Sequence, residues 1–175
     1  RDRHGPVWRK DIAWFLDKYI HWATYTPEDD AVVIAYASVY GGTENAANIL
    51  ACRLREQGVQ VEMFDTSVTP ASYILAAAFR FSHVVLAAPT YNGGVFVTME
   101  NLLHDLTAHG LKGRRAAYIE NGSWAPTSAR GMQKLLEPLN WETAADTVTL
   151  RSALRQGQQE DLERMAAQLA ESVKA

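Results

Sequence analysis

Five strand-like runs alternate with five helix-like stretches after residue 30, and this alternation constrains the fold more than any other feature. The strand-like runs are rich in valine, isoleucine and aromatic residues and lie at 31–37, 59–64, 83–88, 114–120 and 143–150. The helix-like stretches lie near 44–57, 70–80, 97–109, 128–137 and 158–173. The first and third runs, AVVIA and VVLAA, are apolar throughout, as expected of strands that are buried on both faces. The pattern predicts an α/β fold in which helices cover both faces of a parallel sheet.

Residues at the predicted helix ends support these boundaries. Gly58 and Gly110 fall just past helices, where a left-handed residue is favoured. Thr69 and Pro70 have the pattern of a helix N-cap followed by a first-turn proline. The last helix is expected to bury one apolar stripe, formed by Leu162, Met165, Leu169 and Val173.

A separate helical segment precedes the alternating pattern. Its apolar residues recur every three or four positions: Trp8, Ile12, Phe15, Leu16, Tyr19, Ile20 and Ala23. The sequence TPEDD then ends the helix, because proline is disfavoured inside a helix. We therefore expect a helical connector over 1–30, followed by one domain over 31–175. Since the chain begins at Arg1 and not at methionine, we also expect an upstream domain to be missing.

The composition is that of an ordinary globular protein. Apolar residues make up 47% of the chain and charged residues 21%, and the formal net charge of −3 gives no sign of a nucleic-acid partner. The single cysteine, Cys52, is expected to be a small packing residue in a helix. The sequence shows neither a secretory leader nor an apolar run of about 18 residues, so we expect a cytoplasmic protein without a membrane span.

Ligands of open parallel sheets bind beyond the carboxyl ends of the strands, where the strand order reverses, so the loops after strands one, three and four are informative. The first loop is SVYGGTEN, residues 38–45. Gly41 and Gly42 allow a tight turn, and Thr43 is expected to cap the following helix. Ser38, Tyr40 and Thr43 offer neutral donors beside a helix N-terminus, which favours a singly esterified phosphate. An ordinary strand-to-helix turn is the alternative.

Two other phosphate-binding motifs fit this loop less well. A Walker loop requires a lysine that is absent here. A dinucleotide fold would use an acidic residue near Asp65, about 23 residues after the glycines, but the G-x-G-x-x-G pattern is missing. We therefore interpret Asp65 as a turn residue.

The second loop is PTYNGGVF, residues 89–96. Tyr91 could lie against a flat ring, and Asn92, Gly93 and Gly94 form a turn whose peptide planes can reorient. Such a turn suits a flavin, whose N5 gains a proton on reduction and then requires a carbonyl acceptor. A polar turn with a buried tyrosine is the alternative.

The third loop is ENGSWAPTS, residues 120–128. Trp124 follows Asn121, Gly122 and Ser123 at a predicted strand end, where an indole is well placed to stack on a planar ligand. Packing of Trp124 in the core is the alternative. Three such loops at one sheet edge favour a ligand site.

SVYGGTEN, PTYNGG and NGSWAPTS resemble the three FMN-contacting loops of the flavodoxin-like, C-terminal domain of flavodiiron proteins, also called A-type flavoproteins. The likeness extends over 31–175 and implies a doubly wound, five-stranded parallel sheet in the order 2-1-3-4-5. It implies that the FMN phosphate is held by Ser38, Val39, Tyr40, Gly41, Gly42 and Thr43. It implies ring contacts near N5 from Pro89, Thr90, Tyr91, Asn92 and Gly93. It implies that the other side is covered by Asn121, Gly122, Ser123, Trp124, Ala125 and Pro126. Gly42 departs from the family, which often has asparagine there.

The N-terminal segment HGPVWR resembles the end of the metallo-β-lactamase-like domain of the same family, in which the histidine of the HG pair ligates one iron. His4 matches that position, although the preceding RDR departs from the family. One histidine does not make an iron site, so His4 is expected to be a solvated terminal residue and the chain to bind no metal. His83, His104 and His109 are expected to be structural, and the sequence contains no catalytic triad or carboxylate pair that we would assign.

The resemblance implies an FMN-dependent electron-transfer domain of a flavodiiron-type oxygen or nitric oxide reductase that lacks the di-iron catalytic domain. Rubredoxin or a reductase would supply electrons, the parent protein would be a homo-oligomer, and this chain alone would not turn over oxygen or nitric oxide. One alternative is a free-standing flavodoxin-type electron shuttle with a helical extension over 1–30. A flavin-free signalling module of the response-regulator kind is another, but strand one ends in Ala37-Ser38 and lacks the phosphoryl-accepting aspartate of such modules.

Overall fold

A parallel sheet forms the centre of the computed structural model, which describes residues 8–175. His4 and the HG pair lie outside the described residues. The strands of the sheet are β1 (Asp29–Tyr36), β2 (Val61–Asp65), β3 (Phe81–Tyr91), β5 (Arg115–Asn121), β6 (Glu142–Thr143) and β7 (Val148–Leu150). They are ordered β2-β1-β3-β5-β6, and β7 also pairs with β5. Counted with β6 and β7 as one edge strand, this is the predicted order 2-1-3-4-5.

The edge strand predicted over 143–150 is divided by a bulge. Thr143 pairs with Ala116, and Val148 pairs with Ile119. Between these pairs β5 advances three residues while the edge strand advances five, so the edge strand carries two extra residues. An edge strand tolerates such an irregularity because only one of its sides is paired.

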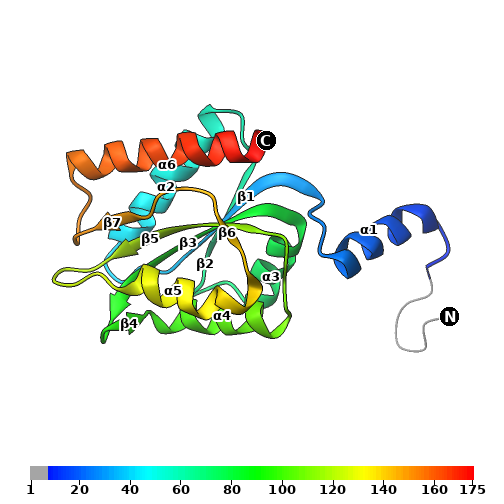
Figure 1. Cartoon of the computed structure of the whole chain (residues 1–175), viewed down its shortest axis with the longest axis horizontal. Coiled ribbons are helices and arrows are strands. Elements are labelled where there is room, and N and C mark those ends of the chain that lie inside the picture. Colours follow the sequence, from blue (N-terminus) through cyan, green and yellow to red (C-terminus); the bar gives the residue numbers. More distant parts are fainter. Residues whose placement is uncertain (1–7) are drawn as a thin grey trace.

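Helices cover both faces of the sheet (Figure 1). One face carries α2 (Gly42–Glu56) and α6 (Gln156–Lys174). The other carries α3 (Ala71–Arg80), α4 (Val97–Ala108) and α5 (Ser128–Leu136), which continues into the short 3-10 helix η1 (Glu137–Leu139). The architecture is the flavodoxin-like, doubly wound arrangement that the alternating pattern and the resemblance predict.

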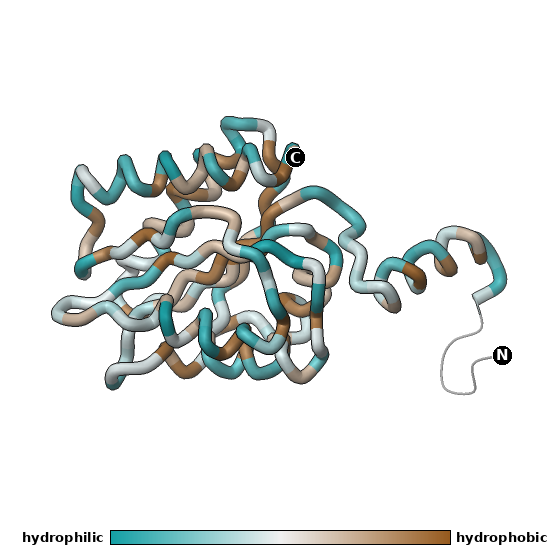
Figure 2. Tube along the Cα trace, viewed as in Figure 1, coloured by the Kyte–Doolittle hydropathy of each residue, from teal (hydrophilic) through white to brown (hydrophobic). Residues whose placement is uncertain are grey.

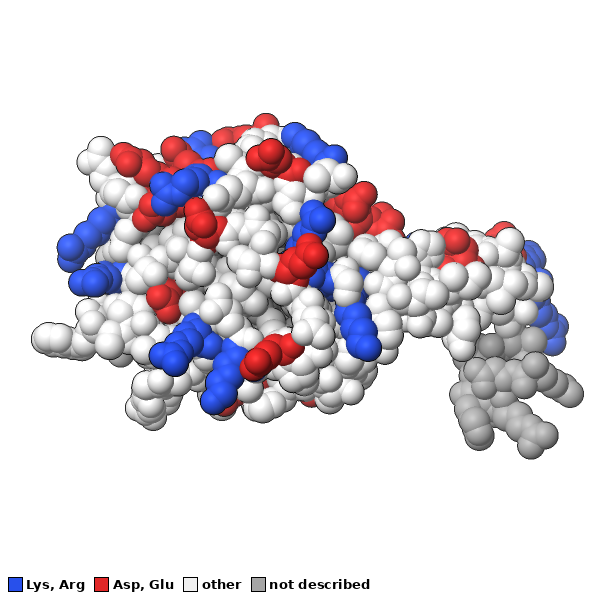
Figure 3. All heavy atoms as spheres, in the orientation of Figure 1, with Lys and Arg blue, Asp and Glu red and all other residues white. Residues whose placement is uncertain are grey.

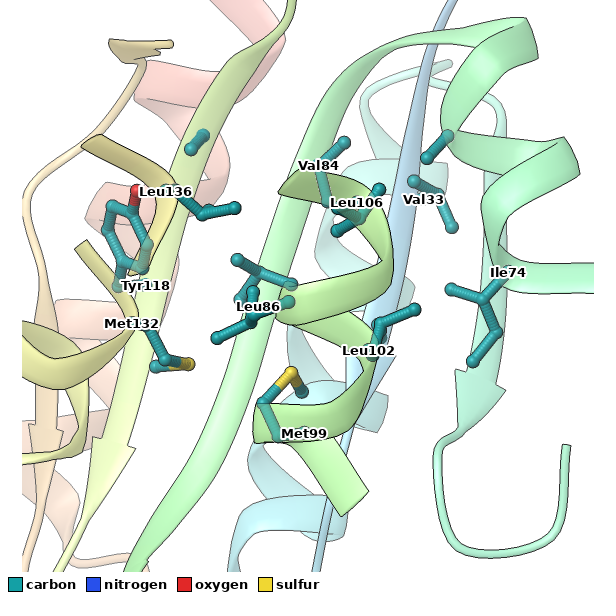
Figure 4. Close-up of a cluster of buried hydrophobic side chains, with 14 of the residues drawn as sticks. Val33, Ile74, Val84, Leu86, Met99, Leu102, Leu106, Tyr118, Met132 and Leu136 are labelled. Carbon is teal, nitrogen blue, oxygen red and sulfur yellow. The ribbon is translucent and has the colours of Figure 1, made fainter. Parts of the chain in front are cut away.

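Each central strand contributes side chains to two apolar layers because successive side chains point to opposite faces. Val33 of β1 belongs to the layer under α3, α4 and α5, whereas Val32 and Ile34 belong to the layer under α2 and α6. The apolar strands therefore lie in the middle of the molecule, between more polar helices, as the hydropathy colours of Figure 2 show. Figure 4 shows one layer, where strands and helices meet through Val33, Leu86, Tyr118, Ile74, Leu102 and Met132.

The observed helix ends agree only in part with those predicted from the sequence. Gly58 and Gly110 adopt φ angles of 78° and 61°, as predicted for left-handed residues after a helix. The prediction for Thr69 and Pro70 was wrong by one position, because Pro70 is the N-cap of α3 and has no side-chain cap bond. The Thr69 N–H instead donates to the Asp65 carbonyl at 2.9 Å, which places Thr69 in the preceding turn.

Helix α1 (Ile12–Thr24) stands apart from the sheet at the end opposite the carboxyl ends of the strands (Figure 1). It begins later than the predicted Trp8, and none of its residues is buried. Most of the apolar stripe predicted for this helix is therefore exposed in the part of the chain that the structure describes: Ile12, Leu16, Tyr19 and Ile20 are exposed, whereas Phe15 is half-buried. Apolar residues of α1 are visible in Figure 2.

Arg114 joins the segment after α1 to the rest of the molecule. Its side chain is 2% exposed and donates hydrogen bonds to five backbone carbonyls. Two of these belong to Ala78 and Phe79 near the end of α3, at 2.7 and 2.6 Å, and a third belongs to Tyr25 at 2.6 Å. Burial lowers the pKa of Arg114 to about 10, so the guanidinium stays charged at neutral pH.

The lone cysteine corrects one sequence prediction. Cys52 is exposed and is not a packing residue. The buried stripe of α2 runs through Ala47, Leu50, Ala51 and Leu54, and position 52 falls outside it because 3.6 residues make one turn.

Of the three histidines expected to be structural, His83 is buried and hydrogen-bonded, whereas His104 and His109 lie on the surface. His83 is 3% exposed, with Nδ1 at 2.7 Å from the Ser82 hydroxyl oxygen and Nε2 at 2.9 Å from that of Ser172. His109 lies on the surface with Nδ1 2.8 Å from the Asp105 carbonyl oxygen, and His104 is exposed.

Two observations concern membrane spans and the distribution of charge in the described part of the chain. Within residues 8–175, no helix is both long enough and apolar enough to cross a bilayer. On the face shown in Figure 3, acidic and basic side chains are interspersed, so this face has no extended basic surface of the kind that nucleic-acid binding requires.

Candidate functional site at the carboxyl edge of the sheet

A hollow of about 390 Å³ lies where the loops after β1, β3, β5 and β7 meet. Three of these loops are the ones singled out in the sequence, and the fourth, after β7, was not predicted. The lining residues are Ser38, Val39, Tyr40, Gly42, Thr43, Pro89, Thr90, Tyr91, Asn121, Gly122, Ser123, Ser152 and Ala153. The volume is within the range of about 300–1,000 Å³ that is usual for small-molecule sites.

The first loop presents a helix N-terminus to the hollow. Gly41, with φ 82°, is the N-cap of α2, so the prediction that Thr43 caps this helix was wrong. Thr43 lies two residues after the N-cap, in the first turn of α2, and is buried, with its hydroxyl oxygen accepting a hydrogen bond from Asn121 Nδ2 at 3.3 Å. The Ser38 oxygen accepts from the Gly41 N–H at 3.1 Å. In both residues the hydroxyl oxygen is an acceptor, which leaves the O–H proton available to a ligand.

The second loop is a β-hairpin that the sequence analysis did not assign. The short strand β4 (Gly94–Val95) pairs antiparallel with the end of β3, and Tyr91 faces Gly94. Asn92 and Gly93 have φ angles of 49° and 76°, the signs required by a type I′ turn. The adjacent Asn-Gly pair in the sequence is a signal for this turn. Tyr91 is half exposed, which contradicts the alternative of a buried tyrosine.

The third loop holds its tryptophan in solvent. Trp124 is 96% exposed, so packing in the core is contradicted. The loop is joined to the second one through Thr90, whose hydroxyl oxygen accepts from the Thr127 N–H at 2.9 Å and the Ser128 N–H at 3.1 Å. Some predicted site residues lie outside the lining of the hollow; they are Gly41, Asn92, Gly93, Trp124, Ala125 and Pro126.

Comparisons with known proteins identify relatives of this chain. No family model matches the sequence. The chain is 30% identical over 134 residues to a nitric oxide reductase of Moorella thermoacetica, a match that covers 77% of this chain and 32% of that protein. It is 23% identical over 174 residues to a rubredoxin-oxygen oxidoreductase of Megalodesulfovibrio gigas, covering 98% of this chain and 43% of that protein. The chain thus spans about a third to two fifths of the length of these curated relatives.

Solved structures share the fold. The flavodiiron protein of Giardia intestinalis superposes with a TM-score of 0.86 at 18% identity, covering 97% of this chain and 42% of that one. A Streptococcus flavodoxin superposes with a TM-score of 0.70 at 24% identity, covering 81% of this chain and 99% of that one.

The chain is a flavodoxin-like domain related to flavodiiron proteins. The family resemblance inferred from the sequence is thereby confirmed for the domain and its fold.

The lining of the hollow in this flavodoxin-like domain is neutral. None of the described lining residues carries a charge. Asp65 does not line it, and its carboxylate accepts from the Ser67 N–H at 2.7 Å, which supports the interpretation of Asp65 as a turn residue. Burial, followed by the nearby carboxylates of Glu44 and Asp65, raises the pKa of Tyr36 beneath the first loop, so its phenol stays neutral.

The free donors of α2 complete the anion-binding character of the first loop. The first N–H groups of a helix have no partner within the helix, and the positive end of the helix dipole lies among them. In α2 these groups belong to residues 42–44, beside the hydroxyls of Ser38 and Thr43. Neutral hydroxyls and free N–H groups without a lysine or arginine fit one terminal phosphate.

The fourth loop is the part of the site that sequence analysis missed. Ser152 and Ala153 follow β7 in the sequence LRSALRQ, which has no glycine-rich turn to attract notice. The Asn121 side chain joins this loop to the third one, since its Oδ1 accepts from the Ser152 N–H at 2.9 Å. The rule that ligands bind beyond the carboxyl ends of the strands applies equally to the last strand and would have indicated this loop.

Proposed function

We propose that this chain is an FMN-dependent electron-transfer domain of a flavodiiron-type oxygen or nitric oxide reductase. The observation that carries the proposal is the uncharged hollow, which has a helix N-terminus and free hydroxyl donors on one side and exposed aromatic side chains near the loops on the other. This combination suits a ligand with a single phosphate at one end and a flat ring at the other.

Different residues of the site would bind different parts of the ligand. Ser38, Thr43 and the free N–H groups of α2 would hold the phosphate, because hydrogen bonds to a charged acceptor are stronger than those to a neutral one. Tyr91 and Trp124 would cover the ring, since both are exposed on loops at this edge of the sheet. Bound FMN would supply the redox chemistry, and the protein would supply binding, orientation and electrostatics.

The proposed electron donor is rubredoxin or a reductase, and the proposed acceptor is a di-iron domain in a homo-oligomeric parent protein. The names of two relatives, a nitric oxide reductase and a rubredoxin-oxygen oxidoreductase, support this route. Among residues 8–175, no three histidine, cysteine or carboxylate side chains are grouped as a metal site. The chain alone is therefore expected to pass electrons on without catalytic reduction of oxygen or nitric oxide.

Titration of the apoprotein with FMN, FAD and NAD tests the cofactor. We expect binding of FMN alone, and an at least tenfold weaker affinity in the double variant Ser38→Ala, Thr43→Ala, since each lost donor contributes roughly 1.5–3 kcal/mol towards a charged acceptor. A matched control is Ser67→Ala, Thr69→Ala, which removes the same two hydroxyl types from the loop after β2, outside the hollow. Wild-type affinity in the first double variant would place the phosphate elsewhere.

A free-standing flavodoxin-type shuttle is the second candidate, because a flavodoxin matches over 99% of its own length. The two functions differ in the electron acceptor. The reduced, FMN-loaded chain can be mixed anaerobically with a flavodiiron core that has been stripped of its own flavin, and nitric oxide consumption followed. Consumption that depends on the added chain supports the flavodiiron assignment, and its absence with retained FMN binding supports the shuttle.

A further inference from the structure

The loop between β7 and α6 approaches the start of α2 closely. Ser152 and Ala153 of this loop line the hollow together with Gly42 and Thr43. Ser152 has a φ of 68°, a left-handed conformation that serine adopts uncommonly. Such a conformation persists only where neighbouring groups enforce it, and the surroundings of Ser152 show which groups do so.

Asn121 is the first of these groups. Its Oδ1 accepts from the Ser152 N–H at 2.9 Å, and its Nδ2 donates to the Ser152 carbonyl at 3.0 Å. The remaining Nδ2 proton is directed to the Thr43 hydroxyl oxygen at 3.3 Å. Both N–H groups of this buried amide are thus engaged by protein atoms, so Asn121 acts as a positioning residue that holds two loops.

Gly42 is the second group, and it acts by leaving space. A Cβ atom at this position would lie 2.4 Å from the Ser152 carbonyl oxygen and 3.2 Å from Asn121 Nδ2. Any side chain at position 42 would therefore displace Ser152. The missing side chain of Gly42 allows Ser152 to lie against the N-terminal end of α2, whose free N–H groups favour an anion.

The Ser152 hydroxyl forms a pair with that of Ser123, and the pair has a proton to offer at this place. The Ser152 oxygen lies 3.0 Å from the hydroxyl oxygen of Ser123, and either can be the donor. A pair of hydroxyls uses one of its two protons internally, which leaves the second available to a ligand in the hollow. Hydrogen bonding within the pair polarises the free O–H and strengthens its donation.

We propose that Ser152 binds the phosphate group of the ligand, paired with Ser123 and held in position by Asn121 and Gly42. The assignment rests on the proposed function, because it takes the ligand to carry a terminal phosphate. It adds a fourth loop to the three that the sequence motifs indicate.

Two substitutions of one residue test the assignment. Ser152→Ala and Ser152→Gly both remove the hydroxyl, but glycine suits the left-handed conformation and alanine does not. We expect each variant to bind FMN about tenfold more weakly than the wild-type chain, the lower end of the effect for a hydrogen bond to a charged group. Riboflavin, which lacks the phosphate, should bind all three chains equally, and Ser67→Ala should leave FMN binding unchanged. Flavin fluorescence measures affinity, and urea unfolding of the apoproteins should show the glycine variant to be more stable than the alanine variant.

The outcomes separate the possible failures. Wild-type FMN affinity in Ser152→Gly, with a loss confined to Ser152→Ala, would mean that the backbone conformation matters and the hydroxyl does not, which overturns the assignment. Equal losses for FMN and riboflavin would also overturn it, because the contact would then be to the ring or the ribityl chain. A wild-type chain that binds neither flavin overturns the proposed function and this assignment together.

Discussion

Burial of His83 makes stability sensitive to mild acid. Its ring lies between the hydroxyls of Ser82 and Ser172, and burial, followed by the charge of Arg115, lowers its pKa from 6.5 to about 4. Asp30 opposes this shift but does not cancel it. The folded protein therefore keeps His83 neutral at pH values at which the unfolded chain would be protonated.

The sign and size of the effect follow from proton linkage. Between pH 6.5 and about 4 the unfolded chain binds a proton that the folded chain excludes, so the free energy of unfolding decreases as the pH falls. Above and below this window His83 makes no further contribution to the slope. One pH unit corresponds to about 1.4 kcal/mol, so the whole window has a ceiling of about 3 kcal/mol. Because Ser172 is half-buried and water can reach this edge of the sheet, we expect about 2 kcal/mol.

Urea unfolding of the apoprotein at a series of pH values from 7.5 to 4 measures this dependence. The matched variant is His83→Gln, which retains a hydrogen-bonding side chain but cannot be protonated. Carboxylates that titrate at the lower end of the range contribute equally to both proteins and cancel in the difference. We expect the wild-type chain to lose about 2 kcal/mol more than the variant. Parallel pH profiles of the two proteins would refute the assignment of the acid sensitivity to His83.

Three further substitutions and one metal analysis test the remaining features. Arg114→Met should decrease the free energy of unfolding by about 3 kcal/mol in urea titrations, because it leaves buried carbonyls without a donor; an unchanged midpoint would show that water replaces the guanidinium. Trp124→Ala should weaken FMN binding by roughly 1–3 kcal/mol, the range for stacking of bases on aromatic side chains, with no change in apoprotein stability, since Trp124 is 96% exposed. Gly42→Ala should decrease apoprotein stability by about 1–3 kcal/mol through the clash with Ser152, and a crystal structure with an unmoved loop would contradict this reason. Elemental analysis of the purified chain should find no stoichiometric iron; two irons per chain would require ligands that we have not identified.

Periodicity predicted the order of elements along the chain, and the loops that follow the strands, together with the family resemblance, predicted the candidate site. Runs such as AVVIA are apolar at every position because both faces of a central parallel strand are covered, and this requirement is visible in a single sequence. Parallel strands end at one edge, so loops that follow them must converge, whatever the details of packing. Tyr40, Tyr91 and Asn121 could therefore be assigned to one site before any coordinates were known, and all three line the hollow.

Tertiary structure decided the features that depend on residues far apart in the chain. The bulge that divides the edge strand depends on its pairing with β5, and the exposure of Trp124 depends on how the third loop is held by Thr90, which lies 37 residues from Thr127. The left-handed Ser152 is set by Asn121, 31 residues away, and by the missing side chain of Gly42. Local propensity favours neither this conformation nor this contact. The sequence by itself determined which strand ends meet, because the apolar pattern of each segment shows whether that segment is buried. The fourth loop of the site, after β7, depended instead on distances between segments that only packing establishes.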